Sequence, residues 1–255
     1  MGVVNVTPDS FSDAGAFLDA DRAVAHALAM AKAGADIIDV GGESTRPGAA
    51  SVSEEEEIRR VVPVINRLRG VTVSVDTTKA VVAERALAAG ARIVNDISAL
   101  RFDTRMVDVA RDAGAGVVLM HMRGTPQTMQ AEPRYDDVVA EVRDFLAKRI
   151  EFAVSHGLKK SQIAIDPGIG FGKTVEQNLA LLAHLDTFAS LGCPVLVGAS
   201  RKSFIGKLLG REPQDRLAGS LAVATWAAAH GASIVRVHDV AETVDAVRMV
   251  EAIQK

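Results

Sequence analysis

The chain alternates between two patterns of hydrophobic positions along almost its whole length. Short apolar runs rich in Val and Ile are followed by longer stretches in which apolar residues recur every three or four positions. The first pattern is typical of strands buried on both faces, and the second is typical of amphipathic helices. The short runs predict strands at Gly2–Asn5, Ile37–Val40, Val71–Asp76, Ile93–Asp96, Gly116–Met120, Ile163–Asp166, Val195–Gly198 and Ile234–Val237.

The longer stretches predict helices that alternate with these strands. Their bounds are Asp21–Ala33, Glu54–Leu68, Ala80–Ala89, Thr104–Ala113, Tyr135–His156, Thr174–Leu185, Leu217–His230 and Val240–Ile253. Four of them lead into the next strand through a turn with glycine: AGAD at 33–36, AGAR at 89–92, AGAG at 113–116 and HGAS at 230–233. Glycine just past a helix end is the expected left-handed cap, so its recurrence marks a repeated strand–helix unit.

Eight such units without a break in composition predict an α/β protein with a single domain, a (β/α)8 TIM barrel over residues 1–255. An open doubly wound sheet is the alternative, but the matched spacing of all the units favours the barrel. Right-handed crossovers would place the carboxyl ends of all the strands at one mouth.

Composition and charge narrow the possible functions. The net charge of −3 argues against general nucleic-acid binding, because such proteins usually carry a basic excess. No apolar run approaches the roughly 18 residues that a membrane span needs, and no signal peptide opens the sequence. The single cysteine, Cys193, excludes an intramolecular disulfide, so we expect a cytoplasmic protein. Cys193 precedes an apolar run and has no basic neighbour, which favours packing over a catalytic thiol.

The run IAIDPGIGFGKT at residues 163–174 resembles a nucleotide-binding loop. A P-loop would need a glycine at position 167, but Pro167 stands there and has no N–H to donate to a phosphate. The dinucleotide-binding pattern fails as well, because Lys173 occupies the place of its third glycine. We therefore expect these glycines to make sharp turns, and Lys173 and Thr174 to open a helix.

Polar residues stand at the end of nearly every predicted strand or in the loop that follows. They are Asn5, Asp39, Asp76, Asn95, Asp96, His121, Asp166, Ser200, Arg201, Lys202, Ser203, Arg236 and His238. A single Asp in such a place is often only a helix cap, which is the alternative for Asp96. Helix caps do not explain a polar group at nearly every strand end, so the pattern predicts one shared site at the barrel mouth.

The polar residues divide into two chemical groups. An amide and cationic donors suit a pyrophosphate, and these are Asn5, Arg46, Arg236 and His238. Carboxylate and amide acceptors with one ammonium group suit a flat, nitrogen-rich heterocycle, and these are Asp76, Asn95, Asp166 and Lys202. No HExxH motif or Cys/His cluster is present, which argues against a tightly held zinc ion. Mg²⁺ that bridges a pyrophosphate keeps most of its waters, so a single Asn oxygen suffices as a protein ligand.

Eight motifs in this order resemble the dihydropteroate synthases of the folate pathway, a pterin-binding family: NVTPDSFSD, GGESTRPG, SVDT, NDI, MHMRGTPQTMQ, DPGIGFGK, GASRKSF and RVHDV. The resemblance implies a transferase that joins 6-hydroxymethyl-7,8-dihydropterin pyrophosphate to para-aminobenzoate and releases pyrophosphate. It also implies competition by sulfonamides and a homodimer. The family usually has a short segment before the first strand, whereas this sequence starts within that strand.

The resemblance also implies a role for each matching residue. Asp76, Asn95, Asp166 and Lys202 would hold the pterin, with Met120 and Phe171 packed beside it. Asn5 would bind Mg²⁺, Arg236 and His238 would bind pyrophosphate, and Ser203 would receive the aminobenzoate carboxylate. Thr45 and Arg46 lie on the second loop, which would help to close the site, and Asp9, Ser10 and Asp13 lie on a first loop that closes over the substrates.

Two other functions stay open at this stage. A pterin-binding methyltransferase barrel would share the pterin carboxylates and amide but would not need the pyrophosphate group of residues. A catalytically silent relative would bind pterin or act as a scaffold. The reaction that the resemblance implies needs no enzyme nucleophile, so we predict no covalent enzyme intermediate.

Overall fold

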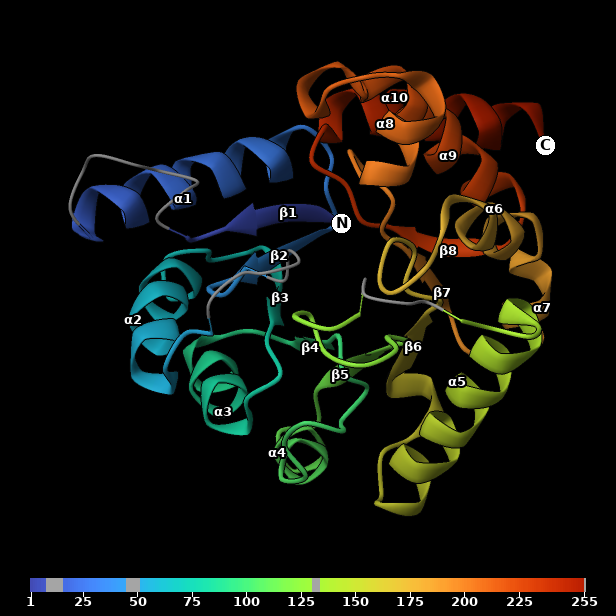
Figure 1. Cartoon of the computed structure of the whole chain (residues 1–255). Coiled ribbons are helices and arrows are strands. Elements are labelled where there is room, and N and C mark those ends of the chain that lie inside the picture. Colours follow the sequence, from blue (N-terminus) through green and yellow to red (C-terminus); the bar gives the residue numbers. More distant parts are fainter. Residues whose placement is uncertain (8–15, 45–50, 130–133, 255) are drawn as a thin grey trace.

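Eight parallel strands form one curled sheet in sequence order, from β1 to β8, in a computed structural model that describes residues 1–7, 16–44, 51–129 and 134–254. Helices surround the strands (Figure 1). The strands are β1 (Gly2–Asn5), β2 (Ile37–Gly41), β3 (Thr72–Asp76), β4 (Ile93–Asp96), β5 (Gly116–Met120), β6 (Ile163–Asp166), β7 (Val195–Val197) and β8 (Ala232–Val235).

The sheet closes between its first and last strands. Gly2 pairs with Val237 in a parallel bridge just beyond β8. The N–H of Val3 donates to the Val237 carbonyl at 3.1 Å, and the Val237 N–H donates to the Met1 carbonyl at 2.9 Å. The predicted barrel is therefore confirmed, and the open sheet is wrong.

The helices of the described residues cover the outside of the barrel. They are α1 (Ala16–Lys32), α2 (Glu54–Ile65), α3 (Ala80–Ala89), α4 (Met106–Asp112), α5 (Val138–Ser155), α6 (Val175–Ala183), α7 (Leu185–Ala189), α8 (Ser203–Leu209), α9 (Leu217–Ala229) and α10 (Val240–Ile253). The recurring glycines end helices as predicted, with φ of +120° at Gly90 and +101° at Gly231. No helix within these ranges combines the length and apolarity needed to cross a bilayer.

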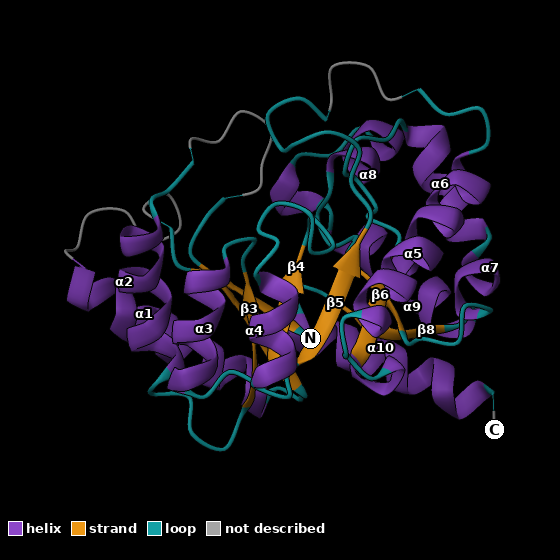
Figure 2. Ribbon diagram, turned by 90° about the horizontal axis from the view of Figure 1, so that it is seen from below, coloured by secondary structure: helices purple, strands orange, loops and turns teal. Residues whose placement is uncertain are grey.

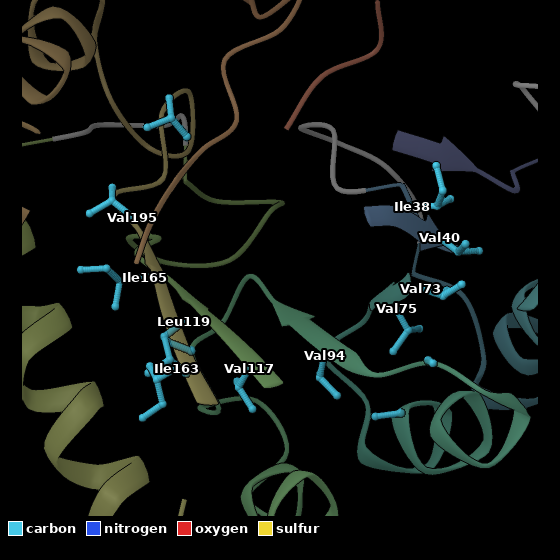
Figure 3. Close-up of a cluster of buried hydrophobic side chains, with 14 of the residues drawn as sticks. Ile38, Val40, Val73, Val75, Val94, Val117, Leu119, Ile163, Ile165 and Val195 are labelled. Carbon is cyan, nitrogen blue, oxygen red and sulfur yellow. The ribbon is translucent and has the colours of Figure 1, made fainter. Parts of the chain in front are cut away.

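The alternation of side chains along the strands separates the core from the site. Ile38 and Val40 of β2 and Val73 and Val75 of β3 belong to the main hydrophobic core, and Figure 3 shows them among the apolar residues of that core. Because successive side chains of a strand point to opposite faces, the intervening Asp39 faces the barrel interior. By the same alternation, Asn5, Asp76, Asn95 and Asp166 follow core residues of their strands and face the barrel interior.

The structure differs from the predicted elements at several ends, and α1 begins at Ala16 rather than at Asp21. The eighth strand is Ala232–Val235, not Ile234–Val237, because a register shift in its pairing with β7 advances the chain. Arg236 consequently follows the strand, although its N–H still bonds to the Val197 carbonyl at 2.9 Å. The short helices α7 and α8 were not predicted, since so few residues give little helical periodicity.

Candidate active site

The strand pairing sets the predicted residues side by side at one end of the barrel. In the parallel register, Asn5 stands opposite Gly41, Gly41 opposite Asp76, and Asp76 opposite Asn95. The carboxyl end of β5 points toward the side of the barrel where α8 lies (Figure 2). The predicted clustering at the barrel mouth thus follows directly from the strand register.

A partly buried ion-pair network lies within this ring of strand ends. The Arg236 guanidinium donates from Nε to Asp39 Oδ2 at 2.6 Å and from Nη2 to Asp76 Oδ2 at 2.7 Å. The Asn95 amide donates to the same Asp39 oxygen at 3.0 Å. Asp39 is fully buried, and its Oδ1 accepts no hydrogen bond from any described residue. Asp39 therefore orients both Asn95 and Arg236.

The sequence prediction included Asp39 among the polar strand residues but gave it no role in the site. The signal that would have found it is a lone carboxylate between two apolar residues of one strand, Ile38 and Val40. Such a position points into the barrel and requires a partner there.

Burial and charge act against each other in this network. Burial raises the pKa of Asp76 to about 7 although Arg236 opposes the shift. Burial alone would lower the pKa of Arg236, but Asp39 and Asp76 more than offset it and hold that pKa above its usual value. With the pKa of Asp76 at about 7, the net charge of this network changes near neutral pH.

Asp166 lies on the opposite side of the ring, level with Met120 in the neighbouring strand. Its Oδ1 accepts the Gly168 N–H at 2.7 Å, and only 5% of the residue is exposed. Burial raises the pKa of Asp166 despite the nearby charge of Lys202. Burial likewise lowers the pKa of Lys202 to about 7. The Lys202 ammonium donates to the Ile169 carbonyl and lies 4.2 Å from the centre of the Phe171 ring.

The glycine-rich run after β6 is a tight loop packed against these groups. Gly168 and Gly170 have φ of +71° and +81°, which favours glycine. A Cβ on Gly168 would collide with the carbonyl oxygen of His121, and one on Gly170 would lie 2.7 Å from Lys202 Cδ. The glycines therefore allow close packing, as the sequence indicated.

The two residues after the loop behave differently from each other. Thr174 caps α6, accepting the Gln177 N–H at 3.2 Å, so the predicted helix start is confirmed there. Lys173 is 4% exposed, and its ammonium bonds to the carbonyls of Gly168 and Phe171, each at 2.9 Å. The Lys173 side chain therefore binds the backbone of the loop itself.

An apolar cluster flanks the loop on the β5 side. It consists of the buried side chains of Ile97, Met120, Met122 and Met129, against which Phe171 packs. Met120 and Phe171 were both predicted beside a flat ligand. The structure brings them into the same cluster next to Lys202.

The segment after β7 faces the segment after β8. The Ser200 hydroxyl lies 3.1 Å from His238 Nδ1 and accepts the His238 N–H at 3.2 Å. Burial, followed by the charge of Arg236, lowers the pKa of His238 to about 4. His238 is therefore neutral at pH 7, not cationic as expected. Ser203 is exposed at the first position of α8, next to Lys202.

Two other sequence-based interpretations have clear outcomes. Asp96 caps no helix: its two oxygens accept the N–H groups of Ser98 at 2.7 Å and Leu100 at 2.9 Å, so it fixes the loop after β4. Cys193 is buried, and burial raises the pKa of its thiol, as expected for a packing residue.

Some predicted site residues lie outside the described ranges, namely Asp9, Ser10, Asp13, Thr45 and Arg46. Asn5 is described and half-buried, and its Oδ1 would lie 3.8 Å from a Cβ placed on Gly41. Within the described ranges, no group of three or more His, Cys, Asp or Glu side chains could hold a metal ion.

Comparison with known proteins identifies the family of this chain. The family model described as pterin binding enzyme matches residues 1–238. The chain belongs to the pterin-binding enzyme family. The dihydropteroate synthase of Escherichia coli (strain K12) is 51% identical over 255 residues, which cover 99% of this chain and 90% of that protein.

Solved structures of pterin-binding enzymes share the whole fold. A Xanthomonas albilineans dihydropteroate synthase with 4-aminobenzoic acid has a TM-score of 0.94 and 53% identity, covering 100% of this chain and 92% of that one. A second structure of the Xanthomonas albilineans enzyme, in complex with 7,8-dihydropteroate, has a TM-score of 0.91 and 50% identity with the same coverage. The resemblance inferred from the motifs is confirmed.

Proposed function

We propose that this chain condenses 6-hydroxymethyl-7,8-dihydropterin pyrophosphate with para-aminobenzoate to give 7,8-dihydropteroate and pyrophosphate. The predicted function of a dihydropteroate synthase, a transferase, is confirmed by the family match and by relatives about half identical over the whole chain. The observation that carries the proposal is the set of acceptors at strand ends of the barrel mouth: the partly buried Asp76, and Asn95 and Asp166, which are buried.

Asp166 is the proposed acceptor for the pterin edge. A carboxylate can take two parallel hydrogen bonds from a ring N–H and an adjacent exocyclic amine. Asp166 Oδ2 lies 4.0 Å from a Cβ placed on Gly198, which has the Arg236 side chain on the same side. Asp76 and Asn95 would bind other pterin edges, and Lys202 would bind a ring acceptor.

Arg236 and His238 are the proposed pyrophosphate ligands, and Ser203 is the proposed ligand of the aminobenzoate carboxylate. Asp76 partly neutralises Arg236 in the unliganded protein. A pterin that hydrogen-bonds to Asp76 would release the guanidinium toward the anion. His238 would contribute a neutral N–H donor, and Thr45 and Arg46 are proposed to complete the closed site.

The donor set fits Mg²⁺ carried by the pyrophosphate. Asn5 supplies a neutral amide oxygen beside Gly41, and magnesium prefers oxygen ligands and retains several waters. Bound there, Mg²⁺ would neutralise charge on the departing group. Adding excess EDTA should abolish turnover and Mg²⁺ should restore it. Asn5→Ala should raise the Mg²⁺ concentration needed for half-maximal rate, and an unchanged requirement would exclude Asn5 as the ligand.

The chemistry leaves little covalent work to the protein. The C–O bond to pyrophosphate breaks, the electron-rich pterin stabilises the resulting cation, and the arylamine attacks that carbon and then loses a proton. The weakly basic arylamine arrives unprotonated, so no strong general base is required. The protein's contribution is to orient the substrates and to balance the charge of the leaving group.

Pyrophosphate release, measured with and without para-aminobenzoate, tests this function directly. We expect stoichiometric release that depends on the arylamine. A methyltransferase barrel would bind the pterin without releasing pyrophosphate, and a silent relative would show no release at all. The presence of Arg236 and His238, which a methyltransferase barrel would not need, favours the synthase over that barrel.

We also propose a cytoplasmic homodimer. Exposed apolar side chains gather on α8, α9 and α10, which lie together in Figure 1: Leu208, Leu209, Trp226, Met249 and Ile253. A second copy that covers this face would remove them from water. Sedimentation velocity should give a dimer for the wild type and a monomer for Met249→Glu. The control Leu179→Glu, on α6, should stay dimeric, and a dimeric Met249→Glu would contradict the proposed interface.

A further inference from the structure

The ammonium group of Lys173 is buried beneath the loop after β6 and is saturated with acceptors. It lies 2.9 Å from the Gly168 carbonyl, 2.9 Å from the Phe171 carbonyl and 3.1 Å from Nδ1 of His121. An ammonium group has three donors, so these three contacts use all of them. Lys173 has no donor left for a phosphate, and its role must be sought within the loop.

The loop needs such a cation because of its backbone conformation. The loop has left-handed turns at Gly168, Gly170 and Gly172, and its Gly168 and Phe171 carbonyls both face the Lys173 ammonium. A buried carbonyl without a partner costs about 1–3 kcal/mol, and one ammonium group satisfies two of them. The buried charge is in turn stabilised by Asp166, although burial lowers the pKa of Lys173 to about 7.

The third contact joins the loop to the neighbouring strand. His121, directly after β5, must keep Nδ1 unprotonated to accept a hydrogen bond from Lys173. Burial lowers the pKa of His121 to about 2, so the ring is neutral. Phe145 of α5 packs edge-on against the ring at 4.8 Å, which fixes its orientation. Lys173 therefore ties the loop to a rigid part of the barrel.

Two short paths lead from Lys173 to residues at the pterin site. The Gly168 carbonyl accepts hydrogen bonds from Lys173 and, at 3.1 Å, from the Phe171 N–H. The N–H of Gly168 donates in turn to Asp166 Oδ1 at 2.7 Å. The second path runs through the Phe171 carbonyl, which fixes the residue whose ring lies against Lys202. The same ammonium thus fixes the neighbours of both a carboxylate and an aromatic ring.

We propose that Lys173 is a positioning residue of the pterin site, holding Asp166 and Phe171 in their ligand-binding arrangement before the substrate arrives. The roles of Asp166 and Phe171 rest on the proposed function. Lys173 does not touch the substrate. A preformed site loses less conformational freedom on binding, so it binds more tightly.

The test compares Lys173→Met, which keeps the length of the side chain but removes its charge and donors, with the wild type. Hydrogen bonds from charged groups support an expected rise of about 10- to 100-fold in the Kd of 6-hydroxymethyl-7,8-dihydropterin pyrophosphate. KM for para-aminobenzoate at saturating pterin substrate should change less than threefold. Phe188→Leu, in the buried core on α7, is the control for lost stability, and it should change neither constant.

A second pair of variants keeps the lysine. His121→Leu removes the third acceptor and should weaken pterin binding in the same direction, whereas His121→Asn can still accept a hydrogen bond and should bind nearly as the wild type. If Lys173→Met does not fold, this pair decides the question. Equal pterin affinity in both His121 variants and the wild type would then overturn the proposal.

Amide hydrogen exchange separates this proposal from the proposed function. In Lys173→Met, the Gly168 N–H should exchange at least tenfold faster than in the wild type, with or without any ligand. If the wild type failed to bind the pterin substrate, the proposed function would fall while the exchange result still tested the positioning. Unchanged exchange at Gly168 together with a Kd within threefold of the wild type would overturn the positioning role.

Discussion

Replacing Asp166 by Ala tests the assignment on which pterin recognition depends. The carboxylate is 5% exposed, takes one N–H from Gly168 at 2.7 Å and lies near the charge of Lys202. Its removal would leave two pterin donors and the Gly168 N–H without their acceptor, and it would remove a negative charge near Lys202. Truncating one partner of a buried charge pair costs about 2–5 kcal/mol, so we expect roughly 30- to 4,000-fold weaker pterin binding.

Stability should respond much less than binding to this change. Because burial raises the pKa of Asp166, the folded protein disfavours its ionised form, and alanine removes that unfavourable term. Calorimetric titration with 6-hydroxymethyl-7,8-dihydropterin pyrophosphate measures the affinity, and thermal unfolding measures the fold. Asp112→Ala, at an exposed position of α4, is the matched control. A loss of less than threefold in affinity for Asp166→Ala would refute its assignment as the main pterin acceptor.

Three further changes test the charge network and the thiol. Asp39→Asn removes the anion that Asn95 and Arg236 share. Because hydrogen bonds to charged groups contribute about 1.5–3 kcal/mol, KM for the pterin substrate should rise roughly 10- to 150-fold. An unchanged KM would count against the network. The pKa of Asp76 is about 7 in the folded protein, compared with an ordinary value of 3.8. Between pH 3.8 and about 7 the folded protein therefore binds a proton that the unfolded chain has lost, so stability should fall as pH rises through this range. Urea unfolding at pH 5 and pH 8 should show a smaller fall for Asp76→Asn, and an equal fall would exclude Asp76 as its source. Cys193→Ala should retain full turnover, and the wild-type thiol should react with iodoacetamide only slowly, since burial raises its pKa.

The sequence predicted the fold well because the barrel repeats one local signal. Each apolar run or glycine cap depends only on a few neighbouring residues. Because the strand–helix unit repeats eight times, few folds other than a barrel fit the sequence. The end of β8 was misplaced because IVRV continues the apolar pattern past the bulge, and only the pairing with β7 sets the register. Such pairing depends on residues distant in the chain, which a local pattern does not contain.

The placement of the candidate residues was predictable where motif and strand end coincide, as at Asp76, Asn95 and Asp166. It was not predictable where a role depends on burial against distant partners. Asp39 appeared as one of several polar residues, and its contact with Arg236 spans 197 positions. The local pattern predicted Lys173 at the start of a helix. Its third acceptor, His121, is 52 positions away in the sequence, so the local pattern did not contain this contact.

The pairing of Arg236 with Asp39 and Asp76 also bears on which cellular anions the mouth admits. Arg236 is already paired with Asp39 and Asp76, so an inorganic phosphate or sugar phosphate that arrives alone must compete with both side chains for the guanidinium. A ligand that carries both donor groups for Asp76 and a pyrophosphate can engage the carboxylate and the arginine together. We therefore expect the paired arginine to favour a pterin pyrophosphate over a simple phosphate.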